Sequence, residues 1–152
     1  MSFDTKKGTR GARQPKGPVF RWINTFTARR LRRKGGKVMG FDALVLTTIG
    51  RKSGVERTTP VAWFPDSDRS WLIVASAAGA VDNPSWYYNI AANPDQVSIH
   101  IDGKTFAVDP EQLEGNERQE AWQRISTDVP RFAKYETKTD REMPIIRLVA
   151  RP

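Results

Sequence analysis

Two pairs of short apolar segments, each joined by a turn that contains glycine, constrain the fold of this chain more than any other feature. Residues 43–48 and 57–64 flank a tight turn at 50–54, and a second pair flanks Asp102-Gly103. The second pair consists of residues 96–101 and 104–108. An Asp-Gly dipeptide between alternating segments is a strong hairpin signal, and hairpins join antiparallel strands. The sequence therefore predicts an antiparallel barrel rather than a parallel doubly wound sheet.

Two more strands and two helices complete the expected body. Residues 71–75 and 143–149 are apolar runs that predict strands. A short helix is expected to begin at Pro84, with Asn83 as its cap, and to end at Asn93. We also expect a second amphipathic helix over 117–126, a turn over 65–68 and a loop over 76–83. The expected fold is thus α+β and mainly β, with about six strands and short helices.

The positive charge of the chain is confined to its N-terminal part. Residues 1–40 hold twelve Lys or Arg and one acid, which gives +11, whereas the remainder holds thirteen basic and sixteen acidic residues, which gives −3. Residues 1–18 contain almost nothing to bury and predict a disordered basic arm. Residues 19–34 have apolar side chains at helical spacing and predict an amphipathic helix. Residues 19–152, including this helix, are expected to form a single domain.

The residue types that are missing exclude several kinds of chemistry. The chain has no cysteine and a single histidine, His100, so disulfides, thiolate nucleophiles and multi-histidine metal sites are excluded, and no metal is expected. No apolar run approaches the roughly 20 residues that span a bilayer, and no apolar segment follows the basic N-terminus as in a secretory signal. We therefore expect a cytoplasmic protein. With so few catalytic side chains, an enzyme of this kind would depend on a cofactor to carry the reaction.

Three groups of residues could bind such a cofactor. The turn at 50–54, with Arg57 just beyond it, places three cations and a hydroxyl beside backbone amides, which suits a phosphate or a series of carboxylates. A solvated hairpin turn is the alternative. The aromatic residues 86–88 predict either a flat cofactor stacked beside Trp86 or simple core packing. The small residues 75–80 would let a ligand approach the backbone closely, or would form a loop without a role.

At these positions the chain resembles the deazaflavin (coenzyme F420)-dependent nitroreductase family, which is found chiefly in actinobacteria. The matching blocks are LVLTTIGRKSG at 44–54, RTTP at 57–60, NPSWYYNIAANP at 83–94 and TDREMPI at 139–145. They cover nearly the whole body and occur in the order of the family. The resemblance implies a split β-barrel related to flavin-binding oxidoreductases, with F420 in a groove along the barrel.

The resemblance also implies roles for individual residues. The turn and the arginine after it would hold the phosphate and polyglutamate tail, the loop after residue 74 would lie along the deazaflavin, and Trp86 would sit near the ring. The cofactor-binding candidates are Arg51, Lys52, Ser53, Gly54, Arg57, Thr59, Pro60, Ala75, Ser76, Ala77, Gly79, Trp86, Tyr87 and Asn89. Tyr135 would line the substrate side and is the candidate catalytic residue.

The implied function is hydride transfer from reduced deazaflavin to a small electrophilic acceptor such as a quinone or a nitroaromatic. The proton would come from Tyr135 or from solvent. Two departures from the family are visible. Ala77 follows Ser76 where many members have a lysine, and Val129 and Phe132 stand where well-known members have tyrosines.

Several alternatives remain open at the level of sequence. FMN or haem could replace F420 in the same barrel, or the chain could bind a cofactor without turnover. The basic arm could bind nucleic acid or another anionic surface. It could equally make a peripheral contact with the inner face of the membrane, or its helix could simply pack on the barrel. We expect no specific nucleic-acid partner, a small-molecule electron acceptor, and either a monomer or a dimer.

Overall fold

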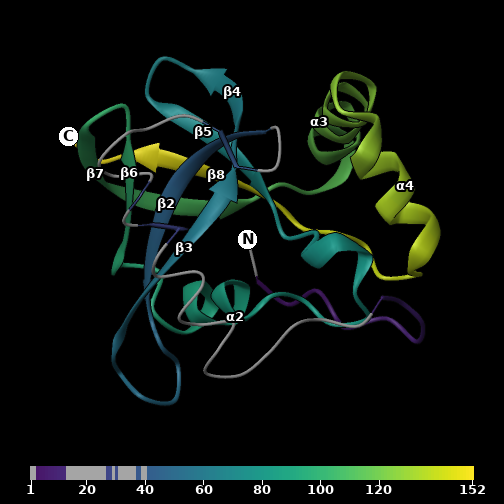
Figure 1. The fold of residues 1–152 in the computed structure, drawn as a ribbon, viewed down its shortest axis with the longest axis horizontal. Helices are drawn as coiled ribbons and strands as arrows, with labels where there is room; N and C mark the ends of the chain where they lie inside the picture. Colours follow the sequence, from purple (N-terminus) through teal and green to yellow (C-terminus); the bar gives the residue numbers. More distant parts are fainter. Residues whose placement is uncertain (1–2, 13–26, 29, 31–36, 39–40) are drawn as a thin grey trace.

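The fold is a strongly curled antiparallel sheet with helices outside it (Figure 1). In the computed structural model, the residues described are 3–12, 27–28, 30, 37–38 and 41–152. Eight strands occur in these residues: β1 Lys37–Val38, β2 Phe41–Ile49, β3 Glu56–Ala62, β4 Phe64–Ser67, β5 Ser70–Val74, β6 Val97–Ile101, β7 Lys104–Gln112 and β8 Ile145–Ala150. The helical elements are η1 Ala77–Gly79, α2 Ser85–Ala92, α3 Gly115–Asp128 and α4 Pro130–Lys138.

The strand order confirms the predicted antiparallel split barrel. The sheet runs β1-β2-β6-β7-β8-β5-β4, with β3 also paired to β2. The two predicted hairpins are β2–β3 and β6–β7, and every strand pair is antiparallel. The count of about six strands was low, because β1 is only two residues long and β4 lies where a turn was expected. Phe64 of β4 pairs with Leu72 of β5, and the chain reverses direction only after Ser67.

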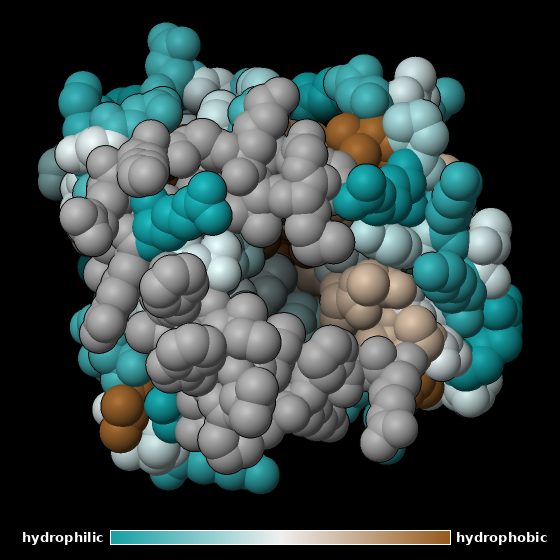
Figure 2. All heavy atoms as spheres, viewed as in Figure 1, coloured by the Kyte–Doolittle hydropathy of each residue, from teal (hydrophilic) through white to brown (hydrophobic). Residues whose placement is uncertain are grey.

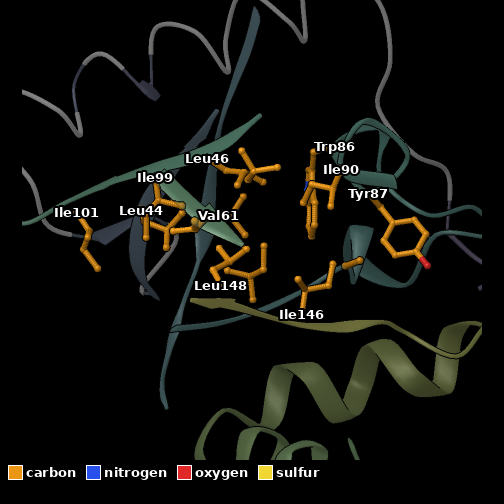
Figure 3. Close-up of a cluster of buried hydrophobic side chains, with 14 residues drawn as sticks. Leu44, Leu46, Val61, Trp86, Tyr87, Ile90, Ile99, Ile101, Ile146 and Leu148 are labelled. Carbon is orange, nitrogen blue, oxygen red and sulfur yellow. The ribbon is translucent and has the colours of Figure 1, made fainter. Parts of the chain in front are cut away.

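The sheet has a core on each of its faces, and β8 contributes to both. The interior of the barrel is filled by residues from six strands, from α2 and from the position after β5: Leu44, Leu46, Val61, Ile73, Ala75, Trp86, Tyr87, Ile90, Val97, Ile99, Ile101, Val108, Ile146 and Leu148 (Figure 3). Ile145 points to the opposite face, where Leu72 and Val74 of β5 pack against Trp122 and Ile125 of α3. The alternation of side chains along a strand thus lets one strand serve two cores.

Helix α4 was not predicted from the sequence. It follows α3 after a single residue, Val129, and begins at Pro130, which is favourable in the first turn of a helix. Within the helix only Phe132 is buried, where its ring packs edge-on against Phe64 at 5.4 Å. One buried apolar residue in nine gives too weak a periodicity for the helix to be recognised.

Residues 3–12 lie extended against the body, so the prediction of a disordered arm over residues 1–18 is wrong for this part. We call residues 3–12 the strap. Its backbone binds the segment after η1, from Gly8 N to Val81 O at 2.7 Å and from Ala12 N to Gly79 O at 2.9 Å. Gly8 and Gly11 approach so closely that a Cβ atom would lie 2.4 Å from Asp140 Oδ1 and 2.5 Å from Val81 N, respectively. The strap is held by hydrogen bonds to residues far along the chain, both from backbone to backbone and through side chains such as Tyr87 and Asp140. A search for apolar residues does not detect such bonds.

Two other expectations concern helix ends. Helix α2 begins at Ser85 with Pro84 as its N-cap, one residue later than predicted, because Asn83 uses its side chain elsewhere. Of the expected helix at 19–34, the structure describes Thr27, Ala28 and Arg30, which are helical, and Ala28 packs on Val45 of β2. The rest of that helix, and residues 13–18 of the expected arm, lie outside the described residues. No helix in the described part is long and apolar enough to cross a membrane.

Candidate functional site

Three cationic side chains lie in or just after the turn between β2 and β3. Arg51 and Lys52 are exposed, and Arg57 is half-buried at the start of β3. The turn is closed by Gly50 N donating to Val55 O at 2.9 Å and Gly54 N donating to Gly50 O at 2.9 Å. In the described part of the chain, none of the three cations forms an ion pair with a carboxylate. Their charge is therefore available to an anionic ligand.

Glycine is required in this turn for two separate reasons. Gly54 has a φ of 70°, a left-handed conformation that side chains disfavour. At Gly50, a Cβ atom would lie 2.6 Å from Ser53 Oγ, which accepts a hydrogen bond from Val55 N at 3.2 Å. Ser53 thus helps to shape the turn. Thr59 and Pro60 follow, half-buried along β3.

Helix α2 holds the turn in position. Asn89 Oδ1 accepts a hydrogen bond from Arg51 N at 3.1 Å, and its amide nitrogen donates to Thr48 Oγ1 at 3.3 Å. The Arg51 guanidinium lies 4.9 Å from the centre of the Tyr88 ring, a cation–π distance. Asn89 is buried and its side-chain amide is bonded to protein on both sides, so it acts on the site through the turn.

The second part of the site is the loop that follows β5. Ala77, Ala78 and Gly79 have φ values of 46°, 53° and 80°, so three successive residues are left-handed. Ala75 and Gly79 are buried, Ser76 and Ala77 are half-buried, and Ala78 is exposed. Left-handed alanines carry strain that surrounding structure must offset, and such strain is common at ligand sites.

Arg141 holds this loop from behind. Its side chain is only 4% exposed, and it donates to three backbone carbonyls, Ala75 O at 2.9 Å, Ser76 O at 2.7 Å and Ala80 O at 3.1 Å. A fourth bond runs to Asn83 Oδ1 at 2.7 Å. Burial lowers the pKa of Arg141, and the negative charge of Asp82 partly opposes this shift. A single guanidinium thus fixes both ends of the loop.

Trp86 and Tyr87 point in different directions from α2 (Figure 3). Trp86 and Ile90 point into the barrel interior, and Trp86 is 8% exposed. Tyr87 is fully buried, with its hydroxyl donating to Gln112 Oε1 at 2.7 Å and accepting from Thr5 N at 3.1 Å. Tyr87 therefore supports the strap and the core.

Tyr135 lies on α4, on the other side of the loop from the barrel. Its ring packs edge-on against Phe132 at 5.5 Å, and Lys138 Nζ lies 5.8 Å from its centre. A Cβ atom at Gly79 would lie 2.9 Å from Tyr135 O, so this turn of α4 contacts the loop directly. The structure therefore brings Tyr135 next to the loop and not next to the cationic turn.

Tyr88 connects the cationic turn to the loop. Its ring lies under Arg51, and its hydroxyl donates to Asp82 and accepts from Asn83 Nδ2 at 3.3 Å. Burial and the hydrogen bond to Asp82 raise the pKa of Tyr88, so the hydroxyl stays protonated near neutral pH. Since Asn83 also accepts from Arg141, a continuous series of contacts joins the two parts of the site.

Comparison with known proteins agrees with this arrangement. The model of the F420H(2)-dependent quinone reductase family matches residues 20–150. An F420H(2)-dependent quinone reductase of Mycobacterium tuberculosis is 35% identical over 112 residues, which cover 72% of this chain and 74% of that relative. The chain belongs to the F420H(2)-dependent quinone reductase family. Coenzyme F420 is accordingly its cofactor, and its activity is the F420-dependent reduction of quinone-like acceptors.

Two solved structures of relatives confirm the fold. The F420-H2 dependent reductase FDR-A is 36% identical, with a TM-score of 0.61, over 70% of this chain and 92% of that one. A structure described as a domain-swapped dimer is 32% identical, with a TM-score of 0.63, over 86% of this chain and 99% of that one. The split barrel and the resemblance to the F420-dependent family are thus confirmed, and the FMN and haem alternatives are set aside.

The residues present fit coenzyme F420. Its phosphate and carboxylates need several cations that are not already paired, and the cationic turn provides Arg51, Lys52 and Arg57. A flat ring needs close access to a backbone, which the small residues of the loop provide. Within the described ranges, no group of three or more His, Asp or Glu could hold a metal ion.

Sequence reasoning missed the residues that position the site without touching its ligand. Arg141 lay inside a matching block but was given no role, because arginine is mostly exposed in folded proteins. The sequence predicts Asn83 as a helix cap, Tyr88 as part of an aromatic run and Asp82 as part of a loop, and it indicates no contact among them. The available signal was an arginine a few residues before an apolar strand, and it does not by itself reveal burial.

Proposed function

We propose that the turn at 50–54 with Arg57 binds the anionic tail of F420, and that the loop at 75–79 lies along the deazaflavin ring. The observation that carries this proposal is the set of cations on the turn that have no carboxylate partner among the described residues. Buried Asn89 fixes the turn beforehand, so less order has to be imposed when the tail binds.

In its reduced form the bound cofactor supplies a hydride. The protein contributes binding, orientation and exclusion of water. We place the quinone-type acceptor beside the loop, on the side where α4 carries the half-buried Tyr135. Tyr135 in this position is the candidate proton donor to the reduced acceptor, and Trp86 forms part of the inner wall.

The tail assignment is tested with the double variant Arg51→Gln/Lys52→Gln. Removing two charges that contact a polyanion should raise the dissociation constant of F420 by a factor on the order of tenfold to a hundredfold, since each charge-assisted contact contributes about 1.5–3 kcal/mol before solvent screening. Fluorescence titrations with long-tailed and short-tailed F420 provide the measurement. The loss should be greater for the long tail.

A matched control removes two cations far from the turn, Lys104→Gln/Lys134→Gln, which lie on the β6–β7 hairpin and on α4. This variant should bind both forms of F420 as the wild type does. Equal affinities of the Arg51→Gln/Lys52→Gln variant and the wild type for long-tailed F420 would overturn the tail assignment.

We further propose that the basic segment around residues 19–34 contacts the anionic face of a membrane. Residues 1–40 carry a charge of +11, and quinone-like acceptors are apolar. Among the described large hydrophobic residues, only Val55 is exposed, at 52%, so the described surface offers no apolar patch for this contact. On the face shown in Figure 2, most of the described atoms are hydrophilic, and the hydrophobic ones lie in small separate groups.

Flotation with vesicles tests the membrane proposal on the full chain. The wild type should float with vesicles that contain anionic lipid and not with neutral ones, and Arg32→Gln/Arg33→Gln/Lys34→Gln should float less. Added salt should release the protein, because the attraction is electrostatic. Recovery of the wild type in the unbound fraction with both kinds of vesicle would contradict the proposal. The solved domain-swapped relative supports a dimer for this chain too, which light scattering can check.

A further inference from the structure

The loop after β5 presents backbone N–H groups that lack partners. In the part of the chain that the structure describes, no hydrogen bond is donated by the amides of Ser76, Ala77 or Ala78. By contrast, Ala75 N donates to Pro144 O at 2.8 Å and Gly79 N donates to Ser76 O at 2.9 Å. The three free donors are therefore consecutive, and they lie in residues that are half-buried or exposed.

The direction of two of these donors follows from the contacts of Arg141. The chain has no cis peptide in its described residues, so each N–H points away from the carbonyl of the same peptide group. The carbonyls of Ala75 and Ser76 both point to the Arg141 guanidinium, to Nη1 and Nη2. The N–H groups of Ser76 and Ala77 consequently point to the opposite side, away from the guanidinium.

Ser76 and Ala77 also have the backbone conformations that bring successive N–H groups together. Ser76 is right-handed, with φ −77° and ψ −37°, and Ala77 is left-handed, with φ 46°. A right-handed residue followed by a left-handed one forms a concave nest of amides that binds anionic or carbonyl oxygen atoms. Ala78, with φ 53°, continues this turn.

The charge of Arg141 strengthens these donors. A hydrogen bond to the carbonyl of a peptide group polarises the whole group, so that its N–H becomes a better donor. Arg141 is 4% exposed and pairs with no carboxylate at ion-pair distance among the described residues. A buried charge of this kind is costly. A neutral amide could bond these carbonyls with a smaller desolvation penalty, so the charge itself requires an explanation.

We propose that the N–H groups of Ser76 and Ala77, backed by the guanidinium of Arg141, bind the carbonyl-bearing pyrimidinedione edge of the deazaflavin and favour the anionic form of its chromophore. This inference rests on the proposed position of the ring along the loop. Arg141 is then a positioning residue, which acts through the two peptide groups. The negative charge of the ionised chromophore is delocalised onto the pyrimidinedione carbonyls, where donors and a nearby positive charge stabilise it.

The ionisation of the bound chromophore provides a direct test, since it changes the visible absorbance of F420 without any turnover. The absorbance is titrated against pH at saturating F420, for the free cofactor and for each protein variant. In the wild type the midpoint should lie at a lower pH than in the free cofactor. Arg141→Gln should bring the midpoint back by about one pH unit, which is a tenfold change in the ionisation constant. Arg141→Lys keeps the charge and should fall between the two.

A second variant keeps Arg141 and removes a donor. Ser76→Pro deletes the N–H of Ser76 at a φ of −77°, which proline adopts without strain. Its midpoint should also move toward that of the free cofactor. Ser76→Ala, which keeps the N–H, should titrate as the wild type does. Arg118→Gln removes another buried arginine, which lies on α3 and donates to Met143 O rather than to the loop, and should leave the midpoint unchanged.

The inference is overturned if Ser76→Pro binds F420 and titrates at the wild-type midpoint, and this holds even if Arg141→Gln fails to fold. It is equally overturned if the wild-type complex titrates like the free cofactor. Neither result concerns the tail, because the midpoint is measured at saturation, whereas the tail assignment depends on affinity. The two proposals therefore fail independently.

Discussion

At the scale of single residues, Asp140 shows how a fully exposed carboxylate can organise a chain segment. It accepts hydrogen bonds from Thr9 N at 2.7 Å, from the Thr9 hydroxyl and from Arg10 N at 3.3 Å. The hydrogen bond from the Thr9 side chain is the largest cause that lowers the pKa of Asp140 from 3.8 to about 2. A carboxyl group with a lowered pKa in the folded state stabilises that state when ionised.

The contribution of Asp140 should therefore be complete above about pH 4 and should disappear as the pH falls through about 2. The chemical shifts of the Gly8, Thr9 and Arg10 amides in NMR spectra should follow this titration. In Asp140→Asn these amides should be shifted already at pH 6 and should not titrate. Asp95→Asn, an exposed site away from the strap, serves as the control. A midpoint near 3.8 in the wild type would show that Thr9 does not hold the ionised form.

At the scale of elements, the contact between α4 and the loop depends on Gly79. This residue has a φ of 80°, and a Cβ atom there would lie 2.9 Å from Tyr135 O and 3.1 Å from Lys138 Cβ. Gly79→Ala combines a left-handed alanine with a steric clash. It should lower the free energy of unfolding by about 2–3 kcal/mol, because each of the two effects costs about 1–2 kcal/mol.

Gly103→Ala separates these two effects in a denaturant titration. Gly103 has a φ of 77°, and a Cβ atom there would meet nothing within 4 Å. This variant should lose only about 1 kcal/mol, from backbone strain alone. Equal losses in the two variants would mean that α4 can move away from Gly79 without cost.

The same elements show which parts of the fold and of the site were predictable. Both hairpins were predicted because glycine turns and alternating apolar residues are local signals, and the cationic turn was recognised for the same reason. The strap and α4 were not predicted, since the strap is held by hydrogen bonds to distant residues and α4 buries little beyond Phe132. The role of Arg141 depends on carbonyl groups about sixty residues away along the chain, which no local pattern indicates.

At the scale of the whole molecule, β8 unites the two cores. Ile145 lies in the core under α3 and α4, its neighbour Ile146 lies in the barrel, and both are fully buried. Ile145→Ala and Ile146→Ala should each lower the free energy of unfolding by about 2–5 kcal/mol. Each variant should still unfold in one transition, because a strand that serves both cores couples them.

Two probes measure this cooperativity. Circular dichroism reports mainly on α3 and α4, and tryptophan fluorescence includes Trp86 in the barrel and Trp122 in α3. The two unfolding curves should coincide for the wild type and for both variants. A helical signal that is lost before the fluorescence changes would show that the helices form a separate unit.

The contacts of Arg141 also bear on how the protein is made. The carbonyls of Ala75 and Ser76 leave the ribosome well before the guanidinium that holds them, since 66 and 65 residues separate the partners. The strap is synthesised even longer before its partner, because Thr9 and Asp140 are 131 residues apart. While the barrel strands before residue 141 are being synthesised, the loop therefore lacks the hydrogen bonds from Arg141 that offset the strain of its left-handed alanines. The loop can therefore reach its final form, and with it the capacity to take up the cofactor, only after Arg141 has been synthesised.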